Sequence, residues 1–248
     1  MTLRQFFEEN PKLALAFSGG VDSAYLLYAA KAFGADVKAY YVKTPFQPEF
    51  EYEDALQLAK ELGAEIVTIH LDVLSDPSIA ENPKNRCYFC KKRIFSAILD
   101  QAKADGYWLI IDGTNASDDA ADRPGMVALK ELEVRSPLRE CGLTKAEIRR
   151  LSKEAGLFTH DKPAYACLAT RIPTGTPITA EKLAITERNE GFLRKLGFSD
   201  FRIRFAGSAA KLQLSEKDIP LLLANRETIL AQLKNDYTEV LLDLEVRR

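Results

Sequence analysis

The stretch LALAFSGGVDS, which spans residues 13–23, decides the fold of this chain. Residues 13–17 are a short apolar run of the kind that forms a buried strand, and residues 23–33 have the spacing of a helix. Between them, two adjacent glycines let the backbone turn tightly and come close to a ligand. The sequence therefore predicts a strand, a glycine turn and a helix in direct succession.

The predicted turn has the properties of a pyrophosphate-binding loop, although a plain strand-to-helix turn is the alternative. The positive end of the helix points at the turn, and the hydroxyls of Ser18 and Ser23 add donors. The carboxylate of Asp22 would repel phosphate unless a metal ion lay between them, so it predicts Mg²⁺. The lysine of the Walker pattern is missing, which excludes an ordinary nucleoside-triphosphatase loop. The predicted phosphate-binding residues are Ser18, Gly19, Gly20, Val21, Asp22 and Ser23.

Strands and helices alternate through the first two thirds of the chain. Further strand-like runs span residues 37–42, 65–71 and 107–111. Helical spacing covers residues 50–62 and 92–103, and a capping box at Thr144 and Glu147 starts a further helix that ends near Gly156. This alternation predicts an α/β fold with a doubly wound parallel sheet, whose ligands bind at the carboxyl ends of the strands. The glycine turn and Asp112 both lie at such ends.

Length and composition indicate a globular protein with a second, smaller domain. The chain has 248 residues, and its 34 basic and 36 acidic side chains give a net charge of −2. The overall charge therefore does not indicate a nucleic-acid binder. No apolar run is long enough to span a membrane, and no signal peptide is apparent, so we expect a cytoplasmic protein with reduced thiols. The segment RIPTGTP predicts a boundary between domains at 1–172 and 173–248.

The predicted C-terminal domain is a small α+β unit. Its expected helices span residues 179–196 and 219–233, and its expected strands span residues 201–205, 211–214 and 239–244. A domain of this size is marginal alone, so we expect it to pack on the first domain or on another subunit, and to bind substrate or support oligomerisation.

Four cysteines carry a possible metal or sulfur chemistry. Cys87 and Cys90 form a C-x-x-C with basic neighbours, which alone fits zinc, an iron–sulfur cluster, a redox dithiol or two structural cysteines. Cys167 lies in the loop segment PAYACLATR, where Arg171 could lower its pKa or hold a phosphate. A lone cysteine is usually a small core residue. We interpret Cys141 in this way, because no spacing argument supports a role for it.

Three motifs together make the chain resemble one family. SGGVDS, RCYFCK and ACLATR look like the LarE family, the PP-loop sulfur transferases of nickel-pincer nucleotide cofactor biosynthesis, and the likeness covers nearly the whole chain. The resemblance implies an adenine-nucleotide alpha-hydrolase-like fold. It also implies that ATP and Mg²⁺ adenylylate a carboxylate of pyridinium-3,5-biscarboxylic acid mononucleotide with release of pyrophosphate. Sulfur then displaces AMP and leaves a thiocarboxylate.

The resemblance implies two alternative sulfur sources. Members with the late cysteine alone are described as sacrificing its sulfur, whereas members with three cysteines are thought to hold a [4Fe-4S] cluster. This chain has Cys87, Cys90 and Cys167, so the cluster is favoured over sacrifice of Cys167. Three ligands leave one iron open to carry a sulfide.

Further site residues follow from the same resemblance. Asp112, Gly113 and Thr114 resemble the second nucleotide loop, although D-G-T-N is also a good turn. Lys145 matches a position near the phosphates, and a solvated surface lysine is the alternative. The predicted catalytic residues are Cys167, Asp22 and Arg171, the last to neutralise charge on the adenylate.

One strand of the predicted small domain carries a candidate anion site. Arg202 and Arg204 alternate and so share one strand face, where they are predicted to bind the substrate phosphate, unless the face is merely solvated. Gln213 departs from the family pattern, which has a carboxylate there, and this puts a metal or arginine-pairing role at that position in doubt.

Two rival functions remain open. A PP-loop tRNA thiolase also combines such a loop with cysteines, but it needs a basic surface for RNA. A non-catalytic nucleotide sensor or zinc-stabilised module would bind ATP without forming AMP. The expected partners are the small nucleotide substrate and either inorganic sulfide or a sulfur-delivery protein, with no membrane or nucleic acid, and the resemblance implies a homo-hexamer.

Overall fold

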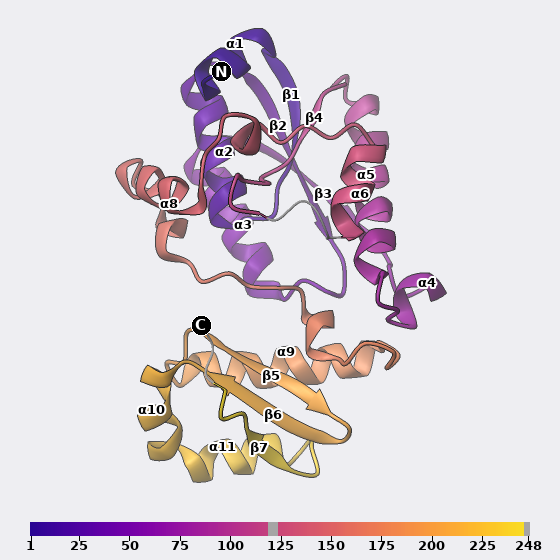
Figure 1. The fold of residues 1–248 in the computed structure, drawn as a ribbon, viewed down its shortest axis with the longest axis vertical. Helices are drawn as coiled ribbons and strands as arrows, with labels where there is room; N and C mark the ends of the chain where they lie inside the picture. Colours follow the sequence, from indigo (N-terminus) through magenta and orange to yellow (C-terminus); the bar gives the residue numbers. More distant parts are fainter. Residues whose placement is uncertain (119–123, 246–248) are drawn as a thin grey trace. The chain divides into compact units, whose positions relative to one another are not determined.

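The computed structural model describes residues 1–118 and 124–245, which form two compact units (Figure 1). Unit 1 comprises Met1–Val73 and Asn85–Tyr165, and unit 2 comprises Leu74–Lys84 and Ala166–Arg248. The predicted domains, 1–172 and 173–248, include residues 119–123 and 246–248, which lie outside the described residues.

Unit 1 is built on a four-stranded parallel sheet with the strand order β3-β2-β1-β4. The strands are β1 (Lys12–Ala16), β2 (Asp36–Lys43), β3 (Glu65–His70) and β4 (Ile110–Ile111). Strand order reverses between β1 and β4, and the crevice outside the carboxyl ends at such a switch point is the usual ligand site of this fold class. The predicted α/β class with a parallel sheet is confirmed.

Helices cover both faces of this sheet, as Figure 1 shows. Alternate residues of β1 enter different cores: Leu13 and Leu15 lie in one apolar cluster, and Ala14 lies in the other. The first cluster contains side chains of α1 (Leu3–Glu9), α2 (Val21–Ala32), α3 (Glu49–Glu61), α7 (Pro137–Glu140) and α8 (Lys145–Glu154). The second contains side chains of α5 (Arg86–Ala104) and α6 (Pro124–Glu131).

Two boundaries in unit 1 differ from the sequence prediction by more than two residues. Helix α5 begins at Arg86, so the C-x-x-C lies inside the helix rather than before it. The predicted strand at 107–111 shortens to Ile110–Ile111, because the N–H of Tyr107 still donates to Ala102 O of the preceding helix end. Gly106 has a φ of +82°, which ends α5 and delays the strand.

Unit 2 contains a three-stranded sheet with helices on one face. Strand β5 (Phe201–Ala206) pairs antiparallel with β6 (Ala209–Leu214), and β7 (Val240–Leu242) pairs parallel with β6. Helices α9 (Ala180–Lys195), α10 (Ile219–Ala224) and α11 (Arg226–Leu233) contribute to the apolar cluster on that face. The shorter elements are α4 (Pro77–Ala80) and the 3₁₀ helices η2 (Leu168–Arg171) and η3 (Glu216–Asp218), while the 3₁₀ helix η1 (Phe158–Asp161) belongs to unit 1.

The second unit differs from the predicted domain because it begins at Ala166 and takes in residues 74–84. Asn82 explains the second difference. Its Nδ2 donates to the carbonyl oxygens of Ile172 (3.2 Å), Pro173 (2.8 Å) and Thr176 (3.2 Å). Its own carbonyl accepts from Gly175 N at 2.8 Å. These bonds tie a segment from the middle of the sequence to the turn that is predicted to separate the domains.

Candidate active site

The glycine turn after β1 forms as predicted and leads into α2. Gly20 is the N-cap of the helix. Gly19 has a φ of +72°, and a Cβ atom there would lie 2.8 Å from Ala55 Cβ, so only glycine fits this position. The turn is thus pressed against α3 and leaves its N–H groups at the carboxyl end of β1.

The two serines of the turn hold its shape from inside. Ser18 Oγ and Ser23 Oγ share a hydrogen bond of 3.1 Å, and Ser23 Oγ donates to Gly20 O at 3.2 Å. Ser18 N donates to Ser23 Oγ at 3.3 Å. Val21 is buried in the core beneath the turn. The hydroxyl groups therefore preorganise the loop, as an anion site at a helix N-terminus requires.

The second predicted loop, which follows β4, packs directly on the first. A Cβ atom on Gly113 would lie 2.9 Å from Ser23 N, so the two backbones touch without room for a side chain. Asp112 is buried and accepts from Thr114 Oγ1 at 2.5 Å and from Ser136 Oγ at 2.7 Å. These bonds fix the loop, and the structure brings the two predicted nucleotide loops together at the switch point.

Asp22 and Lys145 meet at the same place. Lys145, the first residue of α8, brings Nζ to 2.5 Å from Asp22 Oδ2. Asn115 Nδ2 donates to the other carboxylate oxygen at 3.4 Å. Asn115 is not among the predicted site residues, because its contact with Asp22 joins positions 93 residues apart and no local pattern reveals it. The predicted capping box at Thr144 is confirmed, and it places Lys145 at the start of its helix.

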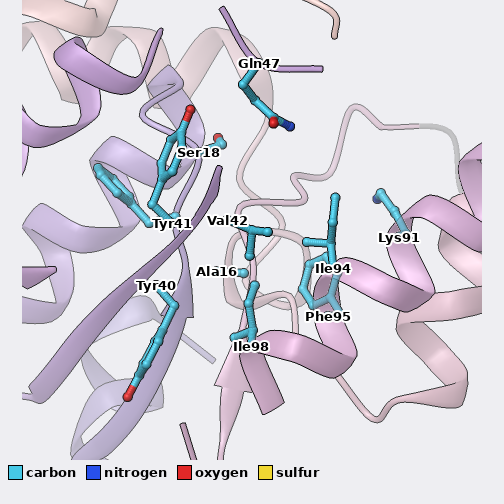
Figure 2. A pocket seen from close by; sticks show the side chains of 11 residues that line it. Ala16, Ser18, Tyr40, Tyr41, Val42, Gln47, Lys91, Ile94, Phe95 and Ile98 are labelled. Carbon is cyan, nitrogen blue, oxygen red and sulfur yellow. The ribbon is translucent and has the colours of Figure 1, made fainter. Parts of the chain in front are cut away.

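A mostly apolar pocket opens beside the glycine turn (Figure 2). Its walls come from the carboxyl ends of β1 and β2 and from α5. Ser18, Gln47 and Lys91 supply polar groups, and apolar side chains such as Val42 and Ile94 supply most of the rest. An apolar pocket with a few polar groups suits a planar base beside a phosphate loop. Sequence reasoning missed Gln47 and Lys91, because only the fold carries these residues to the end of β1.

Cys87 and Cys90 lie near the N-terminus of α5 and three residues apart, so they share one face of the helix. Cys87 is exposed and Cys90 is half-buried. Arg86 Nη2 lies 3.8 Å from Cys87 Sγ, which places a guanidinium beside one of the sulfurs. The described residues contain no group of three or more His, Cys, Asp or Glu arranged to hold a metal ion.

Cys167 lies in unit 2 and is held by Arg171. Arg171 is 1% exposed, and its guanidinium forms a two-pronged ion pair with Glu190 at 2.8 and 2.9 Å. Its third nitrogen, Nη1, donates to Ala166 O at 2.7 Å and to Cys167 O at 3.3 Å. This is the geometry of a positioning residue, which fixes the backbone that carries the thiol. The adenylate-neutralising role of Arg171 stays a prediction.

Arg202 and Arg204 lie on the face of β5 that is opposite to the apolar cluster of unit 2. Arg202 is buried and donates to Phe201 O at 2.6 Å, whereas Arg204 Nε donates to Gln213 Oε1 at 2.5 Å. Arg204 also donates to Thr170 O of the segment that carries Cys167. Gln213 thus still pairs with an arginine, although it is not a carboxylate. Binding of a substrate phosphate by the two arginines stays a prediction.

Cys141 matches its interpretation as an incidental residue. Its side chain is half-buried and packs against the larger core of unit 1, and burial raises the pKa of the thiol. A thiol with a raised pKa is a poor nucleophile at neutral pH.

A parallel sheet with this glycine turn, a second loop at the switch point and no Walker lysine defines the class of PP-loop ATP pyrophosphatases. No protein-family model matches the chain. Over 246 residues, it is 34% identical to pyridinium-3,5-bisthiocarboxylic acid mononucleotide synthase of Lactiplantibacillus plantarum, and the match spans 98% of this chain and 89% of the relative. The chain belongs to the LarE family of ATP-dependent sulfur transferases.

Two other proteins are also similar to this chain. An uncharacterized protein of Synechocystis is 38% identical over 218 residues, which is 88% of this chain and 81% of that protein. The tRNA-specific 2-thiouridylase MnmA of Pseudothermotoga lettingae is 29% identical over 188 residues, but the match spans only 61% of this chain and 54% of the thiouridylase. Among the described residues, no helix is both long and apolar enough to cross a membrane.

Proposed function

We propose that this protein adenylylates a carboxylate of pyridinium-3,5-biscarboxylic acid mononucleotide with ATP and replaces the AMP with sulfur to give a thiocarboxylate. The contact of Gly113 with Ser23 carries the structural part of the proposal, because it joins both nucleotide loops at the switch point. The name of the Lactiplantibacillus relative supports the substrate. We expect the protein to work in the cytoplasm and to form a homo-oligomer.

In the first step, an oxygen of the substrate carboxylate attacks the α-phosphorus of ATP, and the bond to the bridging oxygen of pyrophosphate breaks. The N–H groups of the glycine turn bind the departing pyrophosphate. We expect Lys145, which contacts Asp22 beside this turn, to bind the same phosphates. The second step breaks the bond between the acyl carbon and the AMP oxygen while a carbon–sulfur bond forms. Since AMP is a far better leaving group than oxide, adenylylation makes this exchange possible.

Mg²⁺ fits the residues around Asp22. In phosphate-binding sites this ion is usually held by one or two carboxylates together with the phosphates themselves. Asp22 supplies one carboxylate at the glycine turn, and a lysine ammonium already lies against it as a stand-in cation. A bound Mg²⁺ would supply charge neutralisation between Asp22 and the polyphosphate.

For the sulfur source, we propose a [4Fe-4S] cluster on Cys87, Cys90 and Cys167. The first two fit such a role because they share a helix face and one of them is exposed. A cluster with one open iron would supply a sulfide as the nucleophile. Arg171 would then serve by fixing the backbone of the third ligand. Sacrifice of the Cys167 sulfur is the alternative within the same reaction.

The test is anaerobic purification with iron and sulfide analysis, followed by an assay of AMP and pyrophosphate release with and without the carboxylate acceptor. The proposal requires acceptor-dependent release and a thiocarboxylate product. The protein mass after turnover distinguishes the sulfur sources, because sacrifice removes one H₂S from Cys167. An intact Cys167 with bound iron supports the cluster.

A tRNA thiolase is the second candidate, and the similarity to MnmA favours it. The assay therefore includes an arm with bulk tRNA as acceptor. AMP release that depends on tRNA and not on the pyridinium compound would replace the first proposal with the second. ATP binding without AMP release in either arm would instead indicate a nucleotide sensor.

A further inference from the structure

Four residues at the nucleotide site form a closed ring of hydrogen bonds. Lys145 Nζ lies 2.5 Å from Asp22 Oδ2, and Asn115 Nδ2 donates to Asp22 Oδ1 at 3.4 Å. Ser117 N donates to Asn115 Oδ1 at 2.8 Å. Lys145 N donates to Ser117 Oγ at 3.0 Å, which closes the ring. The start of α2, the loop after β4 and the start of α8 are joined in this way.

The ring assigns each oxygen of Asp22 to a donor. One oxygen contacts an ammonium and the other contacts an amide, so the carboxylate is neutralised while the loop waits for its ligand. The side chains of Asp22 and Lys145 are 22% and 34% exposed, so a metal ion and phosphates in solution can reach the pair. A Mg²⁺ ion at the same carboxylate oxygen would compete with the ammonium for its negative charge, and the two cations would repel each other at so short a separation, so metal binding weakens the hold of Asp22 on Lys145.

We propose that Lys145 occupies the place of the divalent cation at Asp22 and moves to the nucleotide phosphates when the metal binds, with Asn115 and Ser117 as positioning residues. This inference rests on the proposed nucleotide site. The backbone of Lys145 is anchored to Ser117 independently of Nζ, so the exchange needs only rotations of the four-carbon stem. The protein thereby avoids presenting a bare carboxylate to an incoming polyphosphate.

The exchange predicts opposite effects on two affinities when the ammonium is removed. In Lys145→Met, Mn²⁺ no longer competes with Nζ for Asp22. We expect Mn²⁺ to bind about fivefold more tightly without nucleotide, which corresponds to an exposed ion pair of about 1 kcal/mol. A non-hydrolysable ATP analogue with Mg²⁺ is expected to bind about tenfold more weakly, because a phosphate contact of about 1.4 kcal/mol is lost. A lysine with a merely structural role would weaken both.

The experiment measures free Mn²⁺ by electron paramagnetic resonance in the absence of nucleotide, and analogue binding by calorimetry. Lys153→Met, on the exposed last turn of the same helix, is the matched control and should leave both affinities unchanged. Asp22→Asn identifies the site, because it should leave the added Mn²⁺ free in solution. If Lys145→Met lowers the unfolding temperature, Lys145→Gln gives the same comparison.

Unchanged or weaker Mn²⁺ binding in a folded Lys145 variant would overturn the inference. The proposed function fails separately, if the wild-type protein releases no AMP with any acceptor. If Lys145→Met tightens Mn²⁺ binding and weakens analogue binding but the wild type releases no AMP, the cation exchange is supported and the proposed function fails. If the wild type releases AMP but the two affinities do not change in opposite directions, the proposed function is supported and the cation exchange fails.

Discussion

The contact between the two nucleotide loops predicts a large effect of one added methyl group. In Gly113→Ala, the new Cβ would lie 2.9 Å from Ser23 N, 3.2 Å from Ser23 Cα and 3.3 Å from the carbonyl carbon of Asp22. All three are backbone atoms, so no flexible side chain can move aside. Overpacking of this kind costs about 2 kcal/mol, which for a chain of this length lowers the unfolding temperature by roughly 4–8 °C.

The same substitution is expected to disturb nucleotide binding, because the atoms that must move belong to the first turn of α2 and carry the N–H groups of the phosphate loop. We expect at least a tenfold loss of affinity for a non-hydrolysable ATP analogue, which corresponds to about 1.4 kcal/mol. Calorimetry measures the affinity and differential scanning calorimetry the unfolding temperature.

Gly191→Ala is the matched control, because this glycine lies inside α9 and an added Cβ would meet nothing within 4 Å. A helical glycine replaced by alanine should stabilise unit 2 by about 0.5–1 kcal/mol. If Gly113→Ala leaves both the unfolding temperature and the analogue affinity at the wild-type values, the two loops are not in contact and the site as described is refuted.

Three further predictions concern unit 2. Asn82→Asp removes the Nδ2 donor from three carbonyl oxygens and sets a carboxylate against them, so thermal unfolding should show a loss of about 3 kcal/mol, and an unchanged midpoint would contradict the segment's placement. Glu190→Gln leaves the Arg171 charge buried without its partner and should cost about 3–5 kcal/mol and raise the rate of Cys167 alkylation, whereas an unaltered rate would exclude the positioning role. Hydrogen bonds from Lys211 and Gln213 lower the pKa of Asp243 from 3.8 to about 2, so this stabilisation is present above pH 4 and is lost as the pH falls through 2. The difference in unfolding temperature between wild type and Asp243→Asn should therefore shrink as the pH falls from 4 through 2, and a difference that stays constant over that range would refute it.

Local signals allow much of the fold to be predicted from the sequence. The capping box at Thr144 and the glycine turn at residues 19 and 20 depend on atoms a few residues apart, so their residue types reveal them. The apolar run of β1 likewise follows from burial on both faces of the sheet. Together these local features are sufficient to predict a phosphate loop at the carboxyl end of β1.

The contacts that build the site have no such local signal. One example is the ion pair between Arg171 and Glu190, which lies on the following helix α9 and encloses the guanidinium within unit 2. Nothing in the spacing of the two residues identifies them as a pair, because an ion pair depends on how α9 packs on the segment of Cys167. The pocket of Figure 2 has no sequence signal for the same reason, since α5 supplies Lys91 from far along the chain.

The missing Walker lysine shows how sequence and structure complement each other at this site. A loop that binds polyphosphate needs a cation, and the stretch from Ser18 to Ser23 contains none. Lys145 reaches the loop from 123 residues away and is paired there with Asp22, so we propose that the fold supplies this cation from outside the loop. A lysine inside the loop would remain fixed against the phosphates, whereas one on a separate helix can rest on the carboxylate first. In the proposed exchange, Asp22 and Lys145 neutralise each other before the nucleotide binds. Afterwards the metal ion neutralises Asp22 and the phosphates neutralise Lys145, so the two residues act as one device.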